Sequence, residues 1–352
     1  MPKYKFSEIA YNITDKKMPE PGDEELYIGL EHLDSGSLRV TRWGSEVELV
    51  GQKLVMQKGD ILFGRRNTYL RRAAIAPHDG IFSAHGMIFR PNTAVIDPDY
   101  FPFFISSDYF MDAAIRISVG SLSPTVNWKT LKELEFFLPD LNQQRHTAEL
   151  LSAANETKEA YQDLLIRSDE LVKSQFIELS EKAGGKPTRM GDIASYINGA
   201  AFKPKDWSSS GLPIIRIQNL NDPQASYNYF DGTIDDKYLI QTGDILVSWA
   251  THLEAYIWNG GKAWLNQHIF RTVFNKIEVN KTFFLYAANV ALKEAFNKAH
   301  GFKQTMEHIK RGDFEDAIVY LPDLLTQNRF ASFAEQLDKS KFNLQIAIYR
   351  AV

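Results

Sequence analysis

GDILFGRRNTYL at residues 59–70 and GDILVSWATHL at residues 243–253 begin with the same four residues, in distant parts of a chain of 352 residues. Further short motifs recur in the same order and at nearly the same spacing: Ser7-Glu8-Ile9-Ala10 with Gly191-Asp192-Ile193-Ala194, Ser83-Ala84-His85 with Asn266-Gln267-His268, Ile88-Phe89-Arg90 with Ile269-Phe270-Arg271, and Leu138-Pro139-Asp140-Leu141 with Leu321-Pro322-Asp323-Leu324. We interpret the chain as two copies of one unit. Two copies are hard to reconcile with catalysis at a single site, whereas they suit recognition of a target that itself has two halves.

The composition excludes several classes of protein. The hydrophobic fraction of 44% is ordinary for a soluble protein with proper cores. No apolar run reaches the length of about 18 residues that a membrane span needs, and the N-terminus lacks an apolar signal-peptide core. The chain has no cysteine, which excludes disulfides, thiolate metal sites and a cysteine nucleophile, and predicts a cytoplasmic location. The net charge of -4 argues only weakly against nucleic acid, because binding depends on local basic patches.

Each copy begins with a mixed segment and ends with a helical one. Short apolar runs bounded by turn-forming residues predict strands, such as 61–63 in the first copy and 214–217 in the second. A helix is expected over 281–299, with a helical counterpart over 101–117. The predicted fold class is therefore α/β (α+β): recognition domains in tandem duplicate, related by pseudo-two-fold symmetry and separated by long helices.

The segment from 142 to 182 contains neither proline nor glycine and predicts one amphipathic helix, roughly 60 Å long at about 1.5 Å per residue. Its apolar stripe consists of Leu151, Ala154, Tyr161, Leu165, Ser168, Val172 and Leu179, widened by Leu150, Leu164, Leu171 and Phe176. The tail repeats the pattern with Phe330, Phe333, Leu337, Leu344 and Ile348. A lone helix cannot bury such a stripe, so an antiparallel coiled coil between the two is favoured over separate packing of each helix on its own domain.

These patterns divide the chain into four segments. The first recognition domain is expected at residues 1–140, the first helical spacer at 141–185, the second recognition domain at 186–322 and the second spacer at 323–352. The sequence Ala183-Gly184-Gly185-Lys186-Pro187 marks the end of the first spacer, since glycine stops a helix and proline cannot continue it.

The densest basic stretch lies at 53–72, and its loop supplies the main candidates for DNA contact. These are Arg65, Arg66, Asn67, Tyr69, Arg71 and Arg72. Arginine can bond guanine edges, asparagine can bond adenine, and the remaining cations can hold phosphates. A solvated charged loop is the alternative. The corresponding loop of the second copy carries Trp249, Thr251 and His252 instead. Framework residues recur while loop residues differ, as expected if the two copies read different sequences.

Other candidates are weaker taken singly. His85 and His268 occupy matching places; a structural or base-contacting role is favoured over a metal site, because neither has further ligands at suitable spacing. Gln267 can bond an adenine edge or a neighbouring backbone group. The remaining candidates are Lys129, Lys303, Lys310 and Arg311 for phosphates, Asn127 and Gln304 in the same loops, and Arg216, Gln218 and Asn219 after a strand. The alternative for the residues expected to contact phosphates is that they lie in ordinary hinge loops without a binding role.

Two apparent catalytic motifs are discounted. Asp97-Pro98-Asp99-Tyr100 is similar to the Asp-Pro-Pro-Tyr motif of amino-methyltransferases, but it lacks the second proline and no glycine-rich cofactor loop precedes it. Asp140 with Glu156 and Lys158 fits a loose nuclease pattern, although Glu156 and Lys158 fall on the predicted helix rather than on a β-hairpin. The sequence has no P-loop and no HExxH motif.

The repeated motifs resemble those of the DNA-specificity subunits of type I restriction-modification systems. The similarity rests on Gly-Asp-Ile-Leu at 59–62 and 243–246, on 265–270, and on the Leu-Pro-Asp-Leu-x-x-Gln turns at 138–144 and 321–327. It covers the whole chain in the family's order of recognition domain, spacer helix, recognition domain and spacer helix. The second spacer is shorter than the first, and Asn328 stands where the family more usually has glutamate or glutamine.

This resemblance implies a non-catalytic subunit without metal or cofactor that recognises a bipartite double-stranded DNA site. The paired spacers would fix the separation of the half-sites and dock two modification subunits, which hold S-adenosylmethionine and methylate adenine; restriction/translocase subunits would join them. We expect weak, salt-sensitive DNA binding by the isolated acidic chain. The alternatives are a methyltransferase or nuclease that acts by itself, and a duplicated protein-interaction scaffold without a DNA role.

Overall fold

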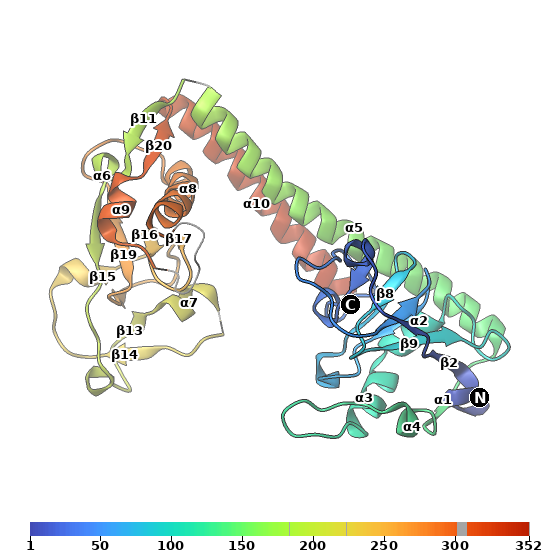
Figure 1. Cartoon of the computed structure of the whole chain (residues 1–352). Coiled ribbons are helices and arrows are strands. Elements are labelled where there is room, and N and C mark those ends of the chain that lie inside the picture. Colours follow the sequence, from blue (N-terminus) through green and yellow to red (C-terminus); the bar gives the residue numbers. More distant parts are fainter. Residues whose placement is uncertain (183, 223, 301–307, 352) are drawn as a thin grey trace. The chain divides into compact units, whose positions relative to one another are not determined.

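The computed structural model describes residues 1–182, 184–222, 224–300 and 308–351 (Figure 1). Lys303 and Gln304 lie outside the described residues. The chain divides into two compact units, Met1–Lys158 and Glu159–Val352, which are described separately below. The boundary falls inside helix α5 (Leu141–Ile177), so the proposed division into four segments stays a prediction. Within the described ranges, no helix combines the length and apolarity that crossing a membrane requires.

The first unit contains two four-stranded sheets and one pair of strands. The larger sheet has the order β2 (Ala10–Ile13), β9 (Met87–Pro91), β6 (Ile61–Phe63), β7 (Ala73–Ile75). The second has the order β3 (Lys16–Lys17), β5 (Lys53–Met56), β8 (Gly80–Phe82), β4 (Tyr27–Ile28), and the pair is β1 (Lys3–Lys5) with β10 (Glu135–Phe137). The helices are α1 (Phe6–Ile9), α2 (Phe101–Ser106), α3 (Asp108–Arg116), α4 (Trp128–Leu131) and the 3-10 turns η1 (Asp23–Leu26), η2 (Leu30–His32) and η3 (Thr68–Leu70).

The core of this unit lies on both faces of strand β9. Phe89 joins an aromatic cluster with Phe6 and Phe110, beside the helices. Ile88, the neighbouring residue, points into a second cluster with Leu54 and Phe82 of the smaller sheet. Successive side chains of a strand point to opposite faces, so one short apolar run supports two layers.

The second unit repeats this plan with the element order of the first. Its sheets are β12 (Ser195–Asn198), β19 (Ile269–Val273), β16 (Ile245–Ser248), β17 (Glu254–Ile257); β14 (Asn228–Phe230), β13 (Leu212–Ile215), β18 (Ala263–Leu265), β15 (Leu239–Ile240); and β11 (Lys186–Arg189) with β20 (Ile318–Leu321). Its helices are α6 (Met190–Ile193), α7 (Ile217–Asn221), α8 (Lys281–His300), α9 (Arg311–Asp316), α10 (Leu324–Ala351), a π-helical turn η4 (Glu178–Lys182), and the 3-10 turns η5 (Pro204–Asp206) and η6 (Asp236–Tyr238).

The Gly-Asp-Ile-Leu motif forms the same turn in both units. The Gly59 amide donates to Ala76 O at 2.9 Å, and the Gly243 amide donates to Trp258 O at 2.7 Å. The two glycines have φ of 90° and 89°, a conformation that favours glycine over other residues. The larger sheets also share their strand order, β2-β9-β6-β7 and β12-β19-β16-β17. The predicted tandem duplicate is confirmed.

The two units differ at the edges of their smaller sheets and in one helix. In both, a central strand has a parallel neighbour, β4 beside β8 and β13 beside β18. The fourth strand joins next to β5 in the first unit and next to β13 in the second. The helix expected over 101–117 is broken at Ser107, which is extended and whose hydroxyl accepts from the Phe110 amide at the start of α3.

The strand pairing corrects one of the repeats. Phe63 lies opposite Met87, whereas Val247, at the equivalent place of the second unit, lies opposite Phe270. The two Ile-Phe-Arg runs are therefore displaced by two residues relative to each other. A shift of two residues leaves every side chain on the same face of the sheet, so hydrophobic periodicity cannot detect it.

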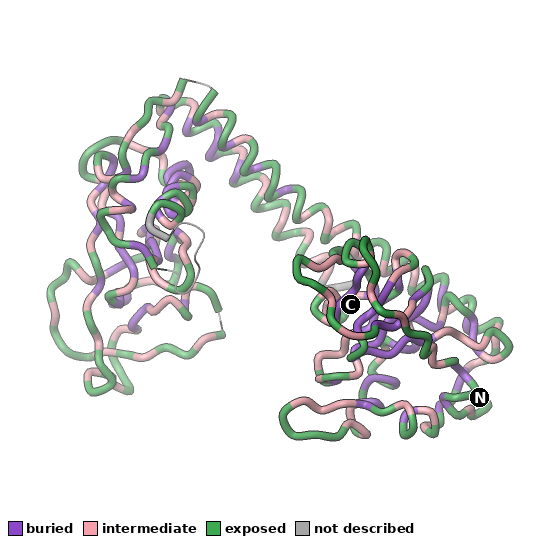
Figure 2. The backbone as a smooth tube through the Cα atoms, in the orientation of Figure 1, coloured by how far each residue is buried: buried purple, intermediate pink, exposed green. Residues whose placement is uncertain are grey.

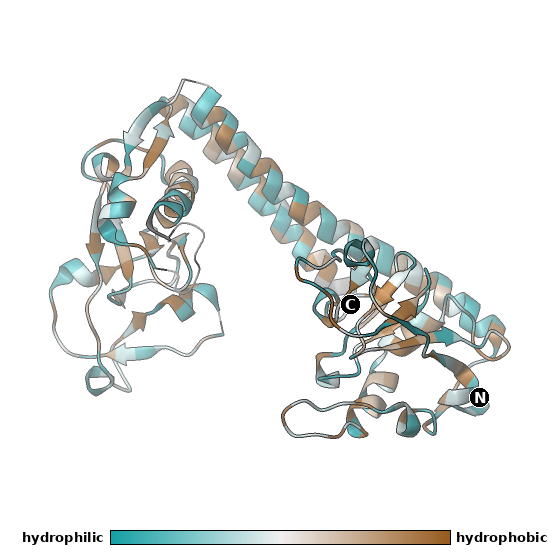
Figure 3. Cartoon of the chain, in the orientation of Figure 1, coloured by the Kyte–Doolittle hydropathy of each residue, from teal (hydrophilic) through white to brown (hydrophobic). Residues whose placement is uncertain are grey.

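The predicted antiparallel pairing of the spacer helices is confirmed within the second unit. Phe176 of α5 packs against Phe330 of α10 with 5.5 Å between ring centroids, and Lys341 Nζ lies 2.8 Å from the Asp169 carboxylate. Later residues of α10 thus meet earlier residues of α5 (Figure 1). Figure 2 shows buried and intermediate positions alternating with exposed ones along α10, and Figure 3 shows apolar positions along the same helix.

The Leu-Pro-Asp-Leu-x-x-Gln motif fastens each spacer helix to its own unit. Gln144, fully buried, accepts from the Asp97 amide at 2.8 Å and donates to Pro139 O at 2.9 Å. Gln327 likewise accepts from the Asn280 amide at 2.9 Å and donates to Pro322 O at 2.8 Å.

The aspartate of the same motif caps each spacer helix. Asp140 accepts from the Gln143 amide, and Asp323 accepts from the Thr326 amide. Aspartate at this position satisfies an amide that the first helical turn leaves unpaired. The motif therefore fixes both the start of the helix and its attachment to the recognition unit.

Replacing the buried glutamine should loosen this attachment. Gln144→Ala leaves the buried Asp97 amide unpaired, and we expect a loss of about 1–3 kcal/mol in the free energy of unfolding, measured by urea denaturation. Gln143→Ala, at the exposed neighbouring position, is the control, with an expected change of at most about 0.5 kcal/mol. Equal losses in the two variants would contradict the role assigned to Gln144.

Candidate nucleic-acid interface

The loop after β6, residues 64–72, is the first contact loop, and it lies beside the segment that precedes α4. The Asn67 amide donates to Pro124 O at 2.7 Å, and the Val126 amide donates to Arg65 O at 3.0 Å. Arg66 forms an isolated β-bridge with Thr125. Two regions that the sequence singled out independently are thus adjacent in the structure.

The tip of the first contact loop carries unsatisfied polar groups. Arg66 and Tyr69 are exposed, the tyrosine by 57%. Arg65 Nε and Asn67 Oδ1 are buried and have no hydrogen-bond partner among the described residues. A buried polar atom without a partner costs free energy, so each such atom needs an explanation.

Arg71 and Arg72, also predicted to contact DNA, make contacts inside the unit. Arg71 forms ion pairs with Asp108, at 2.6 Å, and with Asp112, both on α3. Arg72 donates to Leu30 O at 3.1 Å. In this arrangement both side chains fasten the base of the first contact loop to the rest of the unit, a role that the sequence did not predict.

The second contact loop, residues 249–253, occupies the equivalent place. The Ile309 amide donates to Trp249 O at 3.0 Å, and Ala250 forms a β-bridge with His308. These contacts match those of Arg65 with Val126 and of Arg66 with Thr125 in the first unit. The two contact loops therefore share one backbone frame and differ in side chains.

The second contact loop is built around an aromatic side chain, that of Trp249. The Trp249 ring stacks on Phe270 with 5.8 Å between centroids and lies 5.2 Å from the His268 ring. Trp249 Nε1 and His268 Nδ1 are buried and lack a hydrogen-bond partner in the part of the chain that the structure describes. Trp249 is consequently half-buried in the core, and its indole nitrogen has no partner among the described residues.

Three further candidates surround this pair. Thr251 is exposed and donates to Ala250 O at 2.8 Å. His252 Nε2 lies 3.0 Å from the Glu254 carboxylate, and Gln267 Nε2 lies 3.1 Å from His268 Nε2. Gln267 thus sits beside the Trp249–His268 pair and extends its polar surface.

The correspondence of His85 with His268 agrees with the backbone. Two residues before each histidine, a backbone amide bonds the neighbouring strand: the Ser83 amide donates to Ile28 O at 2.9 Å, and the Asn266 amide donates to Ile215 O at 3.1 Å. The environments nevertheless differ, because His85 is exposed and His268 is half-buried. In the described ranges there is no group of three or more histidine, cysteine, aspartate or glutamate residues arranged to hold a metal ion.

Asn219 is held inside its unit by hydrogen bonds that the sequence did not reveal. It is buried, accepts from the Arg216 amide at 3.1 Å and donates to Ser226 O at 3.1 Å. His32 accepts from the Gly29 amide at the equivalent turn of the first unit, and burial lowers the pKa of its imidazole, which favours the neutral, accepting ring.

The last candidates are the flanking cations and amides. Asn127 and Lys310 are exposed and occupy the matching positions at the N-termini of α4 and α9, with Lys129 exposed on α4. Arg311 pairs with Glu315 at 2.7 Å. Arg216 lies over the Trp207 ring at 5.9 Å, and Gln218 is exposed on α7.

The methyltransferase-like motif is used for folding. The Asp97 carboxylate accepts from the Asp99 amide at 3.0 Å and meets Arg145 Nε of α5 at 3.3 Å. It caps a turn and braces the start of the spacer helix.

The comparisons with known proteins agree with this geometry. Residues 184–350 match the family model described as the type I restriction modification DNA specificity domain. No curated protein sequence matches the chain.

Two solved structures share the fold. One, from a study of complex assembly and conformational transition of the type I R-M system, has a TM-score of 0.56 at 15% identity and covers 99% of this chain and 93% of its own. The other, a type I restriction-modification S subunit from M. genitalium, has a TM-score of 0.56 at 13% identity and covers 99% and 92%. At these identities the likeness shows the fold, in agreement with the predicted tandem α/β architecture. Residues 184–350 are thus similar to the type I restriction modification DNA specificity domain, and the chain as a whole shares the fold of type I restriction-modification S subunits.

Proposed function

We propose that this chain recognises a bipartite double-stranded DNA site, one half with each unit, and positions adenine methyltransferase subunits on it without catalysing a reaction itself. The observation that carries the proposal is the pair of contact loops. They lie at equivalent places on one frame, yet one presents Arg65 and Asn67 while the other presents Trp249 and Gln267 nearby. Different side chains on one frame suit two different half-sites.

The chemistry of the first contact loop suits purine edges. An arginine can bond O6 and N7 of guanine, and an asparagine can bond N6 and N7 of adenine. Arg65 and Asn67 each keep a buried polar atom without a partner in the described chain, so base edges would satisfy groups that the unit leaves unpaired. Exposed Lys129 would contact phosphate, which positions the unit but carries no sequence information.

The catalytic groups and S-adenosylmethionine would belong to the modification subunits. The Asp97 motif supports this division, because its carboxylate is used to cap a turn and to brace α5. A chain with net charge -4 also gains little non-specific grip on DNA, so partners would supply it. The lack of cysteine supports a cytoplasmic location.

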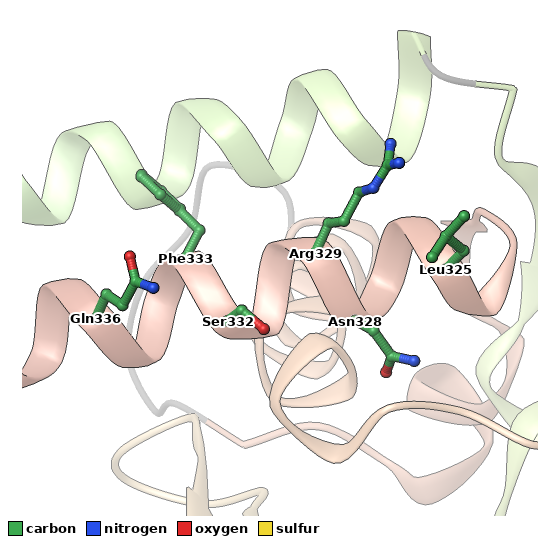
Figure 4. A pocket seen from close by; sticks show the side chains of 6 residues that line it. All are labelled: Leu325, Asn328, Arg329, Ser332, Phe333 and Gln336. Carbon is green, nitrogen blue, oxygen red and sulfur yellow. The ribbon is translucent and has the colours of Figure 1, made fainter.

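The spacer helices would receive two modification subunits, and restriction/translocase subunits would join through them. Leu164 and Leu171, part of the predicted stripe, are each 46% exposed on α5. Leu325, 61% exposed, lines a shallow hollow along α10 with Phe333 and Gln336 (Figure 4). Exposed apolar surface of this kind marks a protein-protein contact.

Removal of the base-contacting side chains tests the main proposal. In the complex with its modification subunits, Arg65→Ala and Asn67→Ala should each relax selection of one half-site, since a bidentate base contact contributes about 1–3 kcal/mol of discrimination. The measurement is the sequence around methylated adenines in treated DNA. Lys16→Ala, on edge strand β3, is the control.

An unchanged methylation pattern in both loop variants would favour the scaffold without a DNA role. A second arm incubates the chain alone with labelled S-adenosylmethionine and DNA. Label transfer without modification subunits would favour the self-acting methyltransferase.

A charge on the spacer surface tests the docking role. Leu164→Glu and Leu171→Glu should reduce co-purification with the modification subunits, because each places a carboxylate in the proposed contact, while the circular dichroism spectrum stays unchanged at these exposed positions. Lys173→Glu changes an exposed residue on another side of the same helix and should leave assembly intact. Full assembly of both leucine variants would place the contact elsewhere.

A further inference from the structure

Strained backbone is concentrated in the two contact loops. Among the residues that the structure describes, three other than glycine have positive φ: Asn67 at 54°, Arg71 at 50° and Thr251 at 57°. The left-handed region is unfavourable for residues with a side chain, and such strain persists only where the surroundings impose it. All three residues lie in the first or the second contact loop.

Asn67 and Thr251 occupy the same position in their units. The carbonyl of Arg65 accepts from the Val126 amide and that of Trp249 from the Ile309 amide, both at 3.0 Å. The left-handed residue follows two positions later in each loop. The residue types differ, an asparagine and a threonine, so the backbone shape is kept while the side chain is not.

Side-chain preference does not account for Thr251. Asparagine tolerates the left-handed region, but a β-branched residue there is an outlier. The Thr251 hydroxyl donates to Ala250 O, the adjoining residue, at 2.8 Å. We therefore attribute the left-handed conformation of Thr251 to the direction that it gives the following backbone.

We propose that Asn67 and Thr251 are positioning residues, whose left-handed backbone aims the neighbouring side chains of each contact loop at DNA. The inference rests on the proposed function of these loops. On one side of the turn, the bridges of Arg66 with Thr125 and of Ala250 with His308 hold the chain to the frame. On the other side of the first loop, left-handed Arg71 returns the chain to α3 and is held there by Asp108 and Asp112.

Glycine and proline separate backbone shape from side-chain chemistry at position 251. Glycine adopts positive φ without strain, so Thr251→Gly keeps the turn and removes the side chain. Proline is fixed at a φ of about -65°, so Thr251→Pro forbids the turn. At position 67 the amide donates to Pro124 O, so Asn67→Val, rather than proline, opposes the left-handed form and Asn67→Gly preserves it.

The experiment uses the full chain in complex with its modification subunits and measures competition between the cognate duplex and duplexes with one half-site scrambled. Thr251→Gly should retain selection of the second half-site to within roughly threefold. Thr251→Pro should lose it by on the order of ten- to a hundredfold, the value of one or two base contacts. Asn67→Gly removes the proposed adenine contact, as Asn67→Ala does, so it should lose selection of the first half-site by about tenfold. Asn67→Val, which also opposes the left-handed turn, should lose more.

Internal controls distinguish positioning from misfolding. Thr251→Pro should still select the first half-site, which shows that the chain is folded and assembled, and Thr233→Pro in an exposed loop of the same unit should behave as the unchanged protein. Equal loss in Thr251→Gly and Thr251→Pro, or no loss in either, would overturn the positioning role. If the unchanged complex selects neither half-site, the proposed function itself fails, which is a separate result.

Discussion

Each unit depends on the tight turn that starts its central strand. The glycine supplies a left-handed backbone, and the aspartate after it accepts from the amide three residues earlier, Gln57 at 2.8 Å in the first unit and Gln241 at 2.9 Å in the second. This turn fixes the entry of β6 and β16, which are hydrogen-bonded on both sides. The same strand ends in a contact loop. Each of these strands therefore connects a turn that is the same in both units to a contact loop whose side chains differ.

Asp60 is further secured in the first unit. Its buried carboxylate receives Nε and Nη2 of Arg90 at 2.8 and 2.9 Å. In the second unit Arg271 instead donates to Leu239 O, consistent with the two-residue displacement of its strand. The turn is therefore held by its own glycine and aspartate, and the arginine is a local addition.

The frame was predictable from the sequence because it depends on local signals. The glycine turn and the aspartate cap of the spacer helix each involve residues close together in the sequence, and the apolar stripe of α10 lies within one helix. The break at Ser107 was missed although it carries a local signal, a serine whose hydroxyl caps the start of α3. The differing edge strands were not predictable, since they depend on partners distant in the chain. The displaced Ile-Phe-Arg run was hidden because the alternation of faces survives a shift of two residues.

The candidate site also had a part that was predictable from the sequence and a part that was not. The sequence located both contact loops, because variable polar residues follow a repeated motif. It did not show that Arg71 pairs with Asp108 and Asp112, or that Asn219 bonds Ser226 O, because charge and residue type are the same for a paired and a free side chain. Left-handed Thr251 was also hidden, since threonine carries no signal for that conformation.

The central claim is that one frame, present twice, reads two different sequences. Its most direct test is to sequence the methylated adenines in DNA modified by the unaltered complex. The account predicts two short specified blocks of different sequence, separated by an unspecified gap of constant length. A single continuous block, or methylation without any common sequence, would contradict it.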